Sequence, residues 1–109
     1  MATQEEIKNM FGEMMNSFRP DKASGENATF QFDLSGDNGG MYWVKVDDGQ
    51  ATHGEGETDA DVTVKANADD FYQIATGDMN PMQAFMMGKI KIDNMNMGMK
   101  LMQWFNMGG

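Results

Sequence analysis

The amino-acid sequence predicts a single α+β domain with a mostly antiparallel sheet of five strands. Three features predict it: helical spacing of apolar residues near the N-terminus, alternation of apolar and polar residues from Ala28, and a return of helix-capping residues at Asn67. The 109 residues are too few for two ordinary domains. We therefore expect one domain over residues 1–109.

The first helix is expected from Thr3 to Phe18. Thr3 and Glu6 have the spacing of a capping box, in which each side chain bonds the backbone N–H of the other residue. The helix should end before Pro20, because the residue preceding a proline avoids helical angles. One face should pack on the core. Its residues are Ile7, Met10, Phe11, Met14, Met15 and Phe18.

The strands are indicated by a hydrophobic period of two, which is typical of half-buried strands. Turns rich in Gly, Asp and Asn join the earlier strands, so consecutive strands should pair in antiparallel fashion. The five expected strands cover residues 28–34, 41–47, 50–57, 62–65 and 89–93.

Three more helices are expected in the second half of the chain. Asn67 can cap a short helix that Gly77 ends, and Asn80 followed by Pro81 is a typical helix start. A last helix should cover residues 95–105. Its apolar stripe consists of Met95, Met99, Met102 and Phe105.

The net charge of −9 argues against a nucleic acid partner, because phosphate backbones attract basic surfaces. Residues 1–78 carry five basic and sixteen acidic side chains, a balance of −11, whereas residues 79–109 carry three lysines and Asp93, a balance of +2. There is no cysteine, no signal-peptide pattern and no run of about 20 apolar residues. These observations predict a cytoplasmic protein.

Methionine is over-represented, with 14 residues, nine of them between Met79 and Met107. This flexible, polarizable side chain suits a surface that repacks around different apolar partners, whereas a rigid core would favour Leu, Ile and Val. Alternatively, Met95, Met97 and Met99 could bind Cu(I), but only in an extended segment, because residues two apart on a helix point in different directions.

Catalytic residues are not evident. His53, the only histidine, falls in a polar strand, and no nucleophile, zinc-protease or phosphate-loop spacing occurs. The acidic residues between Glu55 and Asp61 lack the ligand order of a calcium loop. We therefore expect no enzymatic activity, no metal and no cofactor.

Four separated blocks of the chain carry motifs that are typical of one known protein family. Residues 59–64 (DADVTV) are similar to its AD-x-T-I strand entry, and residues 70–77 (DFYQIATG) to its DF-x-x-L-x-x-G. Residues 81–92 (PMQAFMMGKIKI) resemble P-x-x-A-F-x-x-G-K-L/I-K-I almost throughout. Residues 93–101 (DNMNMGMKL) resemble the ending G-N-M…K-L, although Asp93 stands where Gly is common.

Together these blocks resemble the lipid-binding domain of the sterol carrier protein 2 family. The resemblance covers about residues 28–105 and implies helices packed on one face of the sheet, with an apolar tunnel between the two layers. It implies a carrier for a fatty acyl chain, acyl-CoA, sterol or phospholipid. The alternative is a non-catalytic accessory or dimerisation module of a lipid- or quinone-related enzyme system, and either a monomer or a homodimer is compatible with the sequence. The sequence departs from the family pattern in two places. Its C-terminus is unlike the Ser-Lys-Leu address of peroxisomal members, and Met97 and Met99 stand where the family often has Leu and Ala.

The residues expected to contact the ligand come mainly from the later helices, although each could instead be ordinary core. They are Phe71, Ile74, Phe85, Met86, Met95, Met99, Met102 and Phe105, together with Trp43, whose strand face the pattern does not fix. The basic segment is expected to make transient membrane contact through Lys89, Lys91 and Lys100, unless these lysines merely balance nearby acids.

Overall fold

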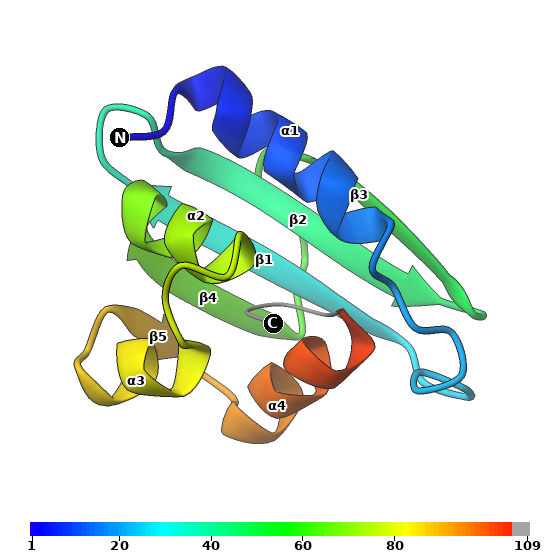
Figure 1. Ribbon diagram of the computed structural model, residues 1–109. Coiled ribbons are helices and arrows are strands. Elements are labelled where there is room, and N and C mark those ends of the chain that lie inside the picture. Colours follow the sequence, from blue (N-terminus) through cyan, green and yellow to red (C-terminus); the bar gives the residue numbers. More distant parts are fainter. Residues whose placement is uncertain (106–109) are drawn as a thin grey trace.

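Five strands form one open sheet, and four helices cover one of its faces in the described part of the chain, residues 1–105 (Figure 1). The computed structural model confirms the predicted α+β class, and the strand order is β3-β2-β1-β4-β5. The elements are α1 Gln4–Met15, β1 Ala28–Ser35, β2 Gly40–Asp47, β3 Gln50–Glu55, β4 Val62–Asn67, α2 Ala68–Ala75, α3 Pro81–Met86, β5 Ile90–Ile92 and α4 Met95–Trp104.

The strand pairing is mostly antiparallel, as predicted. The pairs β1–β2, β2–β3 and β4–β5 are antiparallel, whereas β1 and β4 run parallel. The expectation that consecutive strands pair was wrong for β3 and β4. Residues 56–61 between them carry the chain past β2 and β1, and such a crossover makes parallel pairing possible.

Gln31 holds this crossover on the face of the sheet that the helices leave open. Its side-chain amide donates to the carbonyls of Tyr42, at 2.8 Å, and Gly56, at 3.0 Å. Its Oε1 accepts from the backbone N–H of Thr58 at 2.7 Å. Gln31 is the one buried polar residue within the described range, and these three bonds satisfy it.

The core lies between the sheet and the helices and contains a cluster of aromatic rings. Phe11 of α1 lies 4.7 Å from Tyr42 and 5.3 Å from Phe32, measured between ring centroids. Phe71 of α2 lies 5.2 Å from Phe32. The cluster therefore ties α1 and α2 to β1 and β2.

The first helix begins as predicted and ends earlier. Both bonds of the capping box between Thr3 and Glu6 are present. The helix ends at Met15, and Phe18, which was expected to be helical, forms an antiparallel bridge with Phe105. Their ring centroids are 5.3 Å apart. Phe105 is accordingly extended, so α4 also ends one residue before its expected end.

Candidate functional site

An apolar cavity lies between α2, α3 and α4 and the edge of the sheet formed by β4 and β5. Among the residues that the structure describes, its lining includes no polar side chain. It is lined by Val64, Phe71, Ile74, Pro81, Met82, Phe85, Ile90, Ile92, Met95, Gly98, Met99, Leu101 and Met102.

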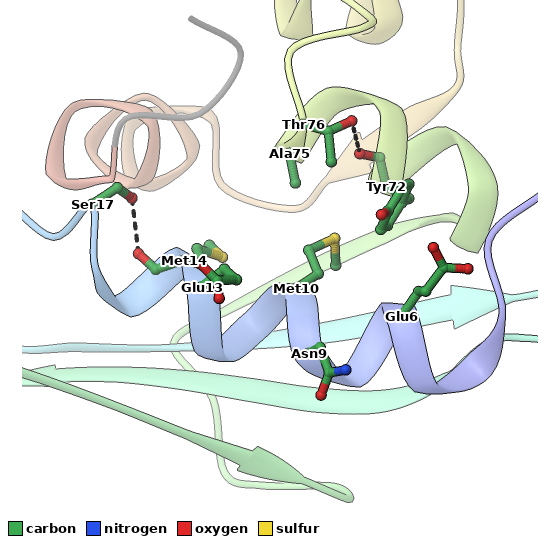
Figure 2. Close-up of a pocket in the computed structure, with 9 residues that line it drawn as sticks. All are labelled: Glu6, Asn9, Met10, Glu13, Met14, Ser17, Tyr72, Ala75 and Thr76. Atoms are coloured by element: carbon green, nitrogen blue, oxygen red, sulfur yellow. Dashed lines mark hydrogen bonds between the residues drawn. The ribbon is translucent and has the colours of Figure 1, made fainter.

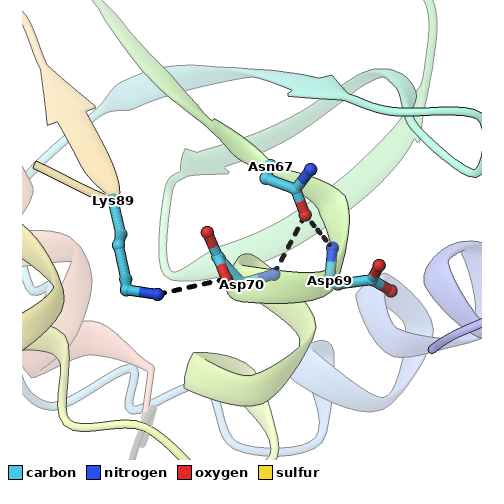
Figure 3. A network of polar contacts seen from close by, with 4 residues as sticks. All are labelled: Asn67, Asp69, Asp70 and Lys89. Atoms are coloured by element: carbon cyan, nitrogen blue, oxygen red, sulfur yellow. Dashed lines mark hydrogen bonds and ion pairs between the residues drawn. The ribbon is translucent and has the colours of Figure 1, made fainter.

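Helix-capping residues and an ion pair position the helices that line this cavity. Asn67 caps α2 by accepting from two backbone N–H groups, and Lys89 forms an ion pair with Asp70 at 3.8 Å, which links α2 to the start of β5 (Figure 3). Asn80 caps α3 in the same way, with Pro81 at its first position. These caps fix where each helix begins and therefore which of its residues face the cavity.

Alternation of apolar and charged residues along β5 completes the lining of the cavity. Ile90 and Ile92 contribute to the lining, whereas Lys91 between them is exposed. Gly98 allows α4 to approach this strand, because a Cβ at that position would stand 2.9 Å from Cδ1 of Ile92. Close packing of α4 against β5 leaves little free space.

The cavity is nearly filled by its own side chains. Its free volume is about 30 Å³, whereas ligand pockets usually measure about 300–1,000 Å³. Met82, Met95 and Met99 line it while remaining substantially exposed to solvent. Methionine side chains therefore stand between the cavity and the solvent.

Six of the nine residues predicted to contact a ligand are brought together in this lining. They are Phe71, Ile74, Phe85, Met95, Met99 and Met102. The other three lie elsewhere. Met86 is largely exposed, and Phe105 is buried against Phe18. Trp43 lies on the open face of the sheet, because its neighbours Tyr42 and Val44 are buried beneath the helices and its indole covers Gly54.

Sequence reasoning missed part of the lining. It did not select Gly98, Met82, Ile90 or Ile92. The alternation of lysine and isoleucine from residue 89 to 92 was a usable signal, because it indicated one apolar face of a strand. No sequence pattern indicated that Gly98 would face that strand.

The three predicted membrane-contact lysines have different surroundings. Lys89 pairs with Asp70, and Lys100 pairs with Glu26. Lys91 is exposed on the open face, where it is the cross-strand partner of Lys65. The local positive balance is therefore partly neutralised by acidic residues from other parts of the chain.

A second hollow, between α1 and α2, has a larger free volume of about 270 Å³ but a mixed lining (Figure 2). Met10, Met14 and Ala75 contribute apolar atoms, and Glu6 and Glu13 contribute carboxylates. Hydrogen bonds from the backbone and hydroxyl of Thr3 hold the pKa of Glu6 below its ordinary value, so the carboxylate stays charged at neutral pH. This charge suits an acyl chain less well than the uncharged lining of the α2–α4 cavity.

Within residues 1–105, no group of three or more histidine, cysteine, aspartate or glutamate side chains could hold a metal ion. His53 is an exposed residue of β3. None of the helices in this range combines the length and the apolar character needed to cross a membrane.

Helices on one face of a mostly antiparallel sheet, with an apolar cavity between the two layers, form the architecture that the sequence resemblance implies. The comparison with protein families agrees, because the SCP-2 sterol transfer family matches residues 11–106. The chain belongs to this family. Domains of this family are non-catalytic modules that bind lipids, and the resemblance noted in the sequence is confirmed.

Curated relatives are longer proteins. Hydroxysteroid dehydrogenase-like protein 2 of Bos taurus is 34% identical over 103 residues, covering 92% of this chain and 25% of the relative. The protein of the same name from Mus musculus is 38% identical over 101 residues, covering 84% of this chain and 21% of the relative. The chain thus spans about a quarter of the length of these relatives.

Solved structures share the fold. Palmitated SCP2L2 from Aedes aegypti has a TM-score of 0.73 at 19% identity, covering 94% of this chain and 93% of that one. Sterol carrier protein domain 2 of Helicoverpa armigera has a TM-score of 0.57 at 28% identity, covering 91% and 81%. A variant of the sec-alkylsulfatase PisA1 reaches 0.78 at 22% identity, covering 95% of this chain and 16% of the enzyme.

Proposed function

We propose that the protein carries a single fatty acyl chain, alone or as part of acyl-CoA or a phospholipid, or a sterol of similar apolar character, in the cavity between α2, α3, α4 and β5. The observation that carries this proposal is the lining, which is apolar throughout the described residues. Each buried methylene contributes about 0.8 kcal/mol, so a dozen can offset the entropy lost when a chain is immobilised. Palmitated SCP2L2 from Aedes aegypti, which shares the fold, is consistent with such a ligand.

Binding requires the cavity to expand, since its free volume is about 30 Å³. The C-terminal end of α4 is tied down, because the Trp104 carbonyl accepts from the backbone N–H of Arg19 at 2.7 Å and Lys100 pairs with Glu26. The short helix α3 and the first half of α4 carry the exposed lining methionines Met82, Met95 and Met99. We expect these two segments and their methionines to move outward when a ligand enters.

The test is titration with a fluorescent fatty acid. Met99→Asp and Phe85→Asp place a carboxylate in the lining and should weaken binding at least about tenfold, because an unpaired charge is poorly tolerated in an apolar environment. Met86→Asp is the matched control, since Met86 neighbours Phe85 but does not line the cavity. Equal binding by all four proteins, or equal loss in the control, would rule out this cavity as the site.

An accessory role is the second candidate, and the length of the relatives favours it. The chain corresponds to about a quarter of hydroxysteroid dehydrogenase-like protein 2, and its fold also occurs within an alkylsulfatase. As an accessory or dimerisation module, the domain would act beside an enzyme rather than as a free carrier. Native mass spectrometry separates the two, because co-purified lipid on a monomer supports the carrier and an empty obligate dimer supports the module.

Three further expectations belong to the carrier hypothesis. The chain itself should catalyse no reaction, so lipid extracted after prolonged incubation should be chemically unchanged by mass spectrometry. Membrane contact should be transient and should involve the exposed methionines of α3 and α4. Residence in the cytoplasm, predicted from the absence of cysteine, of a signal-peptide pattern and of a long apolar run, stays a prediction that cell fractionation can test.

A further inference from the structure

Exposed methionines gather where α3 and α4 close the cavity. Apart from Met1, the exposed large apolar side chains in residues 1–105 are Met82, Met86, Met87, Met95 and Met99. Three of them, which we call the rim methionines, also line the cavity: Met82 is 49% exposed, Met95 38% and Met99 48%. By contrast, Met10 and Met14 in α1 are each 6% exposed. The rim methionines therefore contact both solvent and the apolar interior.

We propose that the rim methionines are modification sites, whose oxidation by hydroperoxides to methionine sulfoxide switches off lipid binding. This inference rests on the proposed function, because it concerns the same cavity. Sulfoxides are reduced back by methionine sulfoxide reductases, so the switch is reversible. The sequence contains no cysteine, and no thiol of this chain competes for the oxidant.

The chemistry is a two-electron oxygen transfer. A lone pair of the thioether sulfur attacks the terminal oxygen of a hydroperoxide, the O–O bond breaks, and the S–O bond forms. The proton of that oxygen passes to the departing alkoxide, so the hydroperoxide leaves as an alcohol, or as water when the oxidant is hydrogen peroxide. The reaction needs the oxidant to reach the side chain, and each rim methionine is more than a third exposed to solvent.

Oxidation changes the lining where a ligand enters. The product is polar and can accept hydrogen bonds, and no hydrogen-bond donor side chain lines the cavity in the described residues. In the unliganded protein the sulfoxide can turn toward water. A bound acyl chain covers it, and burying an unpaired polar group opposes binding. Met86 and Met87 are more exposed, at 80% and 69%, but lie outside the lining, so their oxidation should leave binding intact.

The first measurement is the order of oxidation. The protein is treated with limiting hydrogen peroxide, and sulfoxide is quantified in each peptide by mass spectrometry. The rim methionines, Met86 and Met87 should be modified well before Met10 and Met14, while Met107 lies outside the described residues. Equal oxidation of rim and α1 methionines in protein that remains folded would overturn the assignment.

The second measurement is binding of a fluorescent fatty acid before and after peroxide. The affinity of oxidised wild-type protein for the probe should fall about tenfold or more. It should recover after treatment with the two methionine sulfoxide reductases, one of which reduces each sulfoxide epimer. M82L/M95L/M99L is compared with its own untreated form, and its affinity should not change on peroxide treatment, because leucine is close to methionine in volume but cannot be oxidised. M86L/M87L is the matched control and should remain as sensitive as the wild type.

The outcomes separate the two proposals. If untreated wild-type protein does not bind the probe, the proposed function fails, whatever oxidation does. If untreated protein binds and oxidised protein binds equally well, the inference fails while the proposed function stands. Loss of binding in oxidised M82L/M95L/M99L to the same extent as in wild type would also overturn the inference, because it would place the sensitive group elsewhere.

Discussion

Two phenylalanines that line the same cavity should respond differently to truncation. Phe71 is buried, and its ring lies 6.0 Å from Phe11 and 5.2 Å from Phe32 between centroids. Phe71→Ala should therefore reduce the free energy of unfolding by about 3–5 kcal/mol, the usual effect of a cavity in a packed core. Phe85 is half-buried and belongs to no such ring cluster. Phe85→Ala should reduce the free energy of unfolding by about 0.8–1.5 kcal/mol, half the transfer free energy of a fully buried side chain.

Urea unfolding followed by circular dichroism measures both values. The slope of free energy against urea should match the wild type in each variant, so that a shift in midpoint reports stability alone. A loss of about 4 kcal/mol is a large part of the roughly 5–15 kcal/mol that stabilises a small domain. Equal destabilisation by the two variants would refute the reasoning, because the wall formed by α3 would then be ordinary core rather than a closed ligand site.

Three other predictions concern the fold and its ligand. A saturating fatty acid, at about 100 times its dissociation constant, should add about 2.7 kcal/mol to stability in a thermal or urea assay, and a melting temperature unaffected by every lipid class would contradict a carrier. Gln31→Leu should reduce the free energy of unfolding by about 2–3 kcal/mol, because the carbonyl of Gly56 and the N–H of Thr58 lose their partner; a change within experimental error would mean that water replaces these bonds. Glu6→Gln should remove the contribution that the charged carboxylate of the capping box makes to the free energy of unfolding. The pKa of Glu6 is lowered on folding, so its stabilising contribution is fully present above the ordinary carboxyl pKa and is lost as the pH falls through the lower folded value. The stability difference between wild type and Glu6→Gln should therefore shrink in acid, and a difference independent of pH would contradict this linkage.

Local signals allowed much of the fold to be predicted. Capping residues such as Thr3, Asn67 and Asn80 depend on their nearest neighbours, and each begins a helix where expected. The parallel pairing of β1 with β4 depends on a crossover held by Gln31, which sequence periodicity does not report. A hydrophobic period identifies strands, but not which strand lies beside which.

The candidate site was predicted less completely, because its geometry depends on how helices pack. Met95 and Met99 formed an obvious apolar stripe, yet the fully buried face of α4 is Gly98, Leu101 and Trp104. The alternating methionines Met95, Met97 and Met99 gave no indication that α4 would turn Gly98 toward β5. The sequence also showed no sign of the ion pairs that Lys89 and Lys100 form with distant segments. These pairs change the interpretation of the basic C-terminal segment.

Delivery to membranes is the prediction that these ion pairs modify most. A lysine near anionic lipid contributes up to about 1 kcal/mol, but Lys89 and Lys100 already face Asp70 and Glu26. Their replacement would leave two carboxylates without partners. Lys91 points away from the cavity, on the open side of the sheet. The three lysines should therefore contribute less to the attraction toward anionic lipid than three independent charges would.

Transfer of a bound fluorescent fatty acid to vesicles tests this argument. The triple change of Lys89, Lys91 and Lys100 to Gln should slow transfer to anionic vesicles by about two- to tenfold, leave transfer to neutral vesicles unchanged, and matter less at high salt. Met86→Gln with Met87→Gln should slow transfer to both vesicle types, because apolar contact with acyl chains does not depend on lipid charge. If the lysine variant slows transfer equally to both vesicle types, or to neither, electrostatic orientation plays no part in delivery. If the methionine variant transfers lipid as fast as wild type, the exposed apolar surface beside the cavity is not the membrane contact.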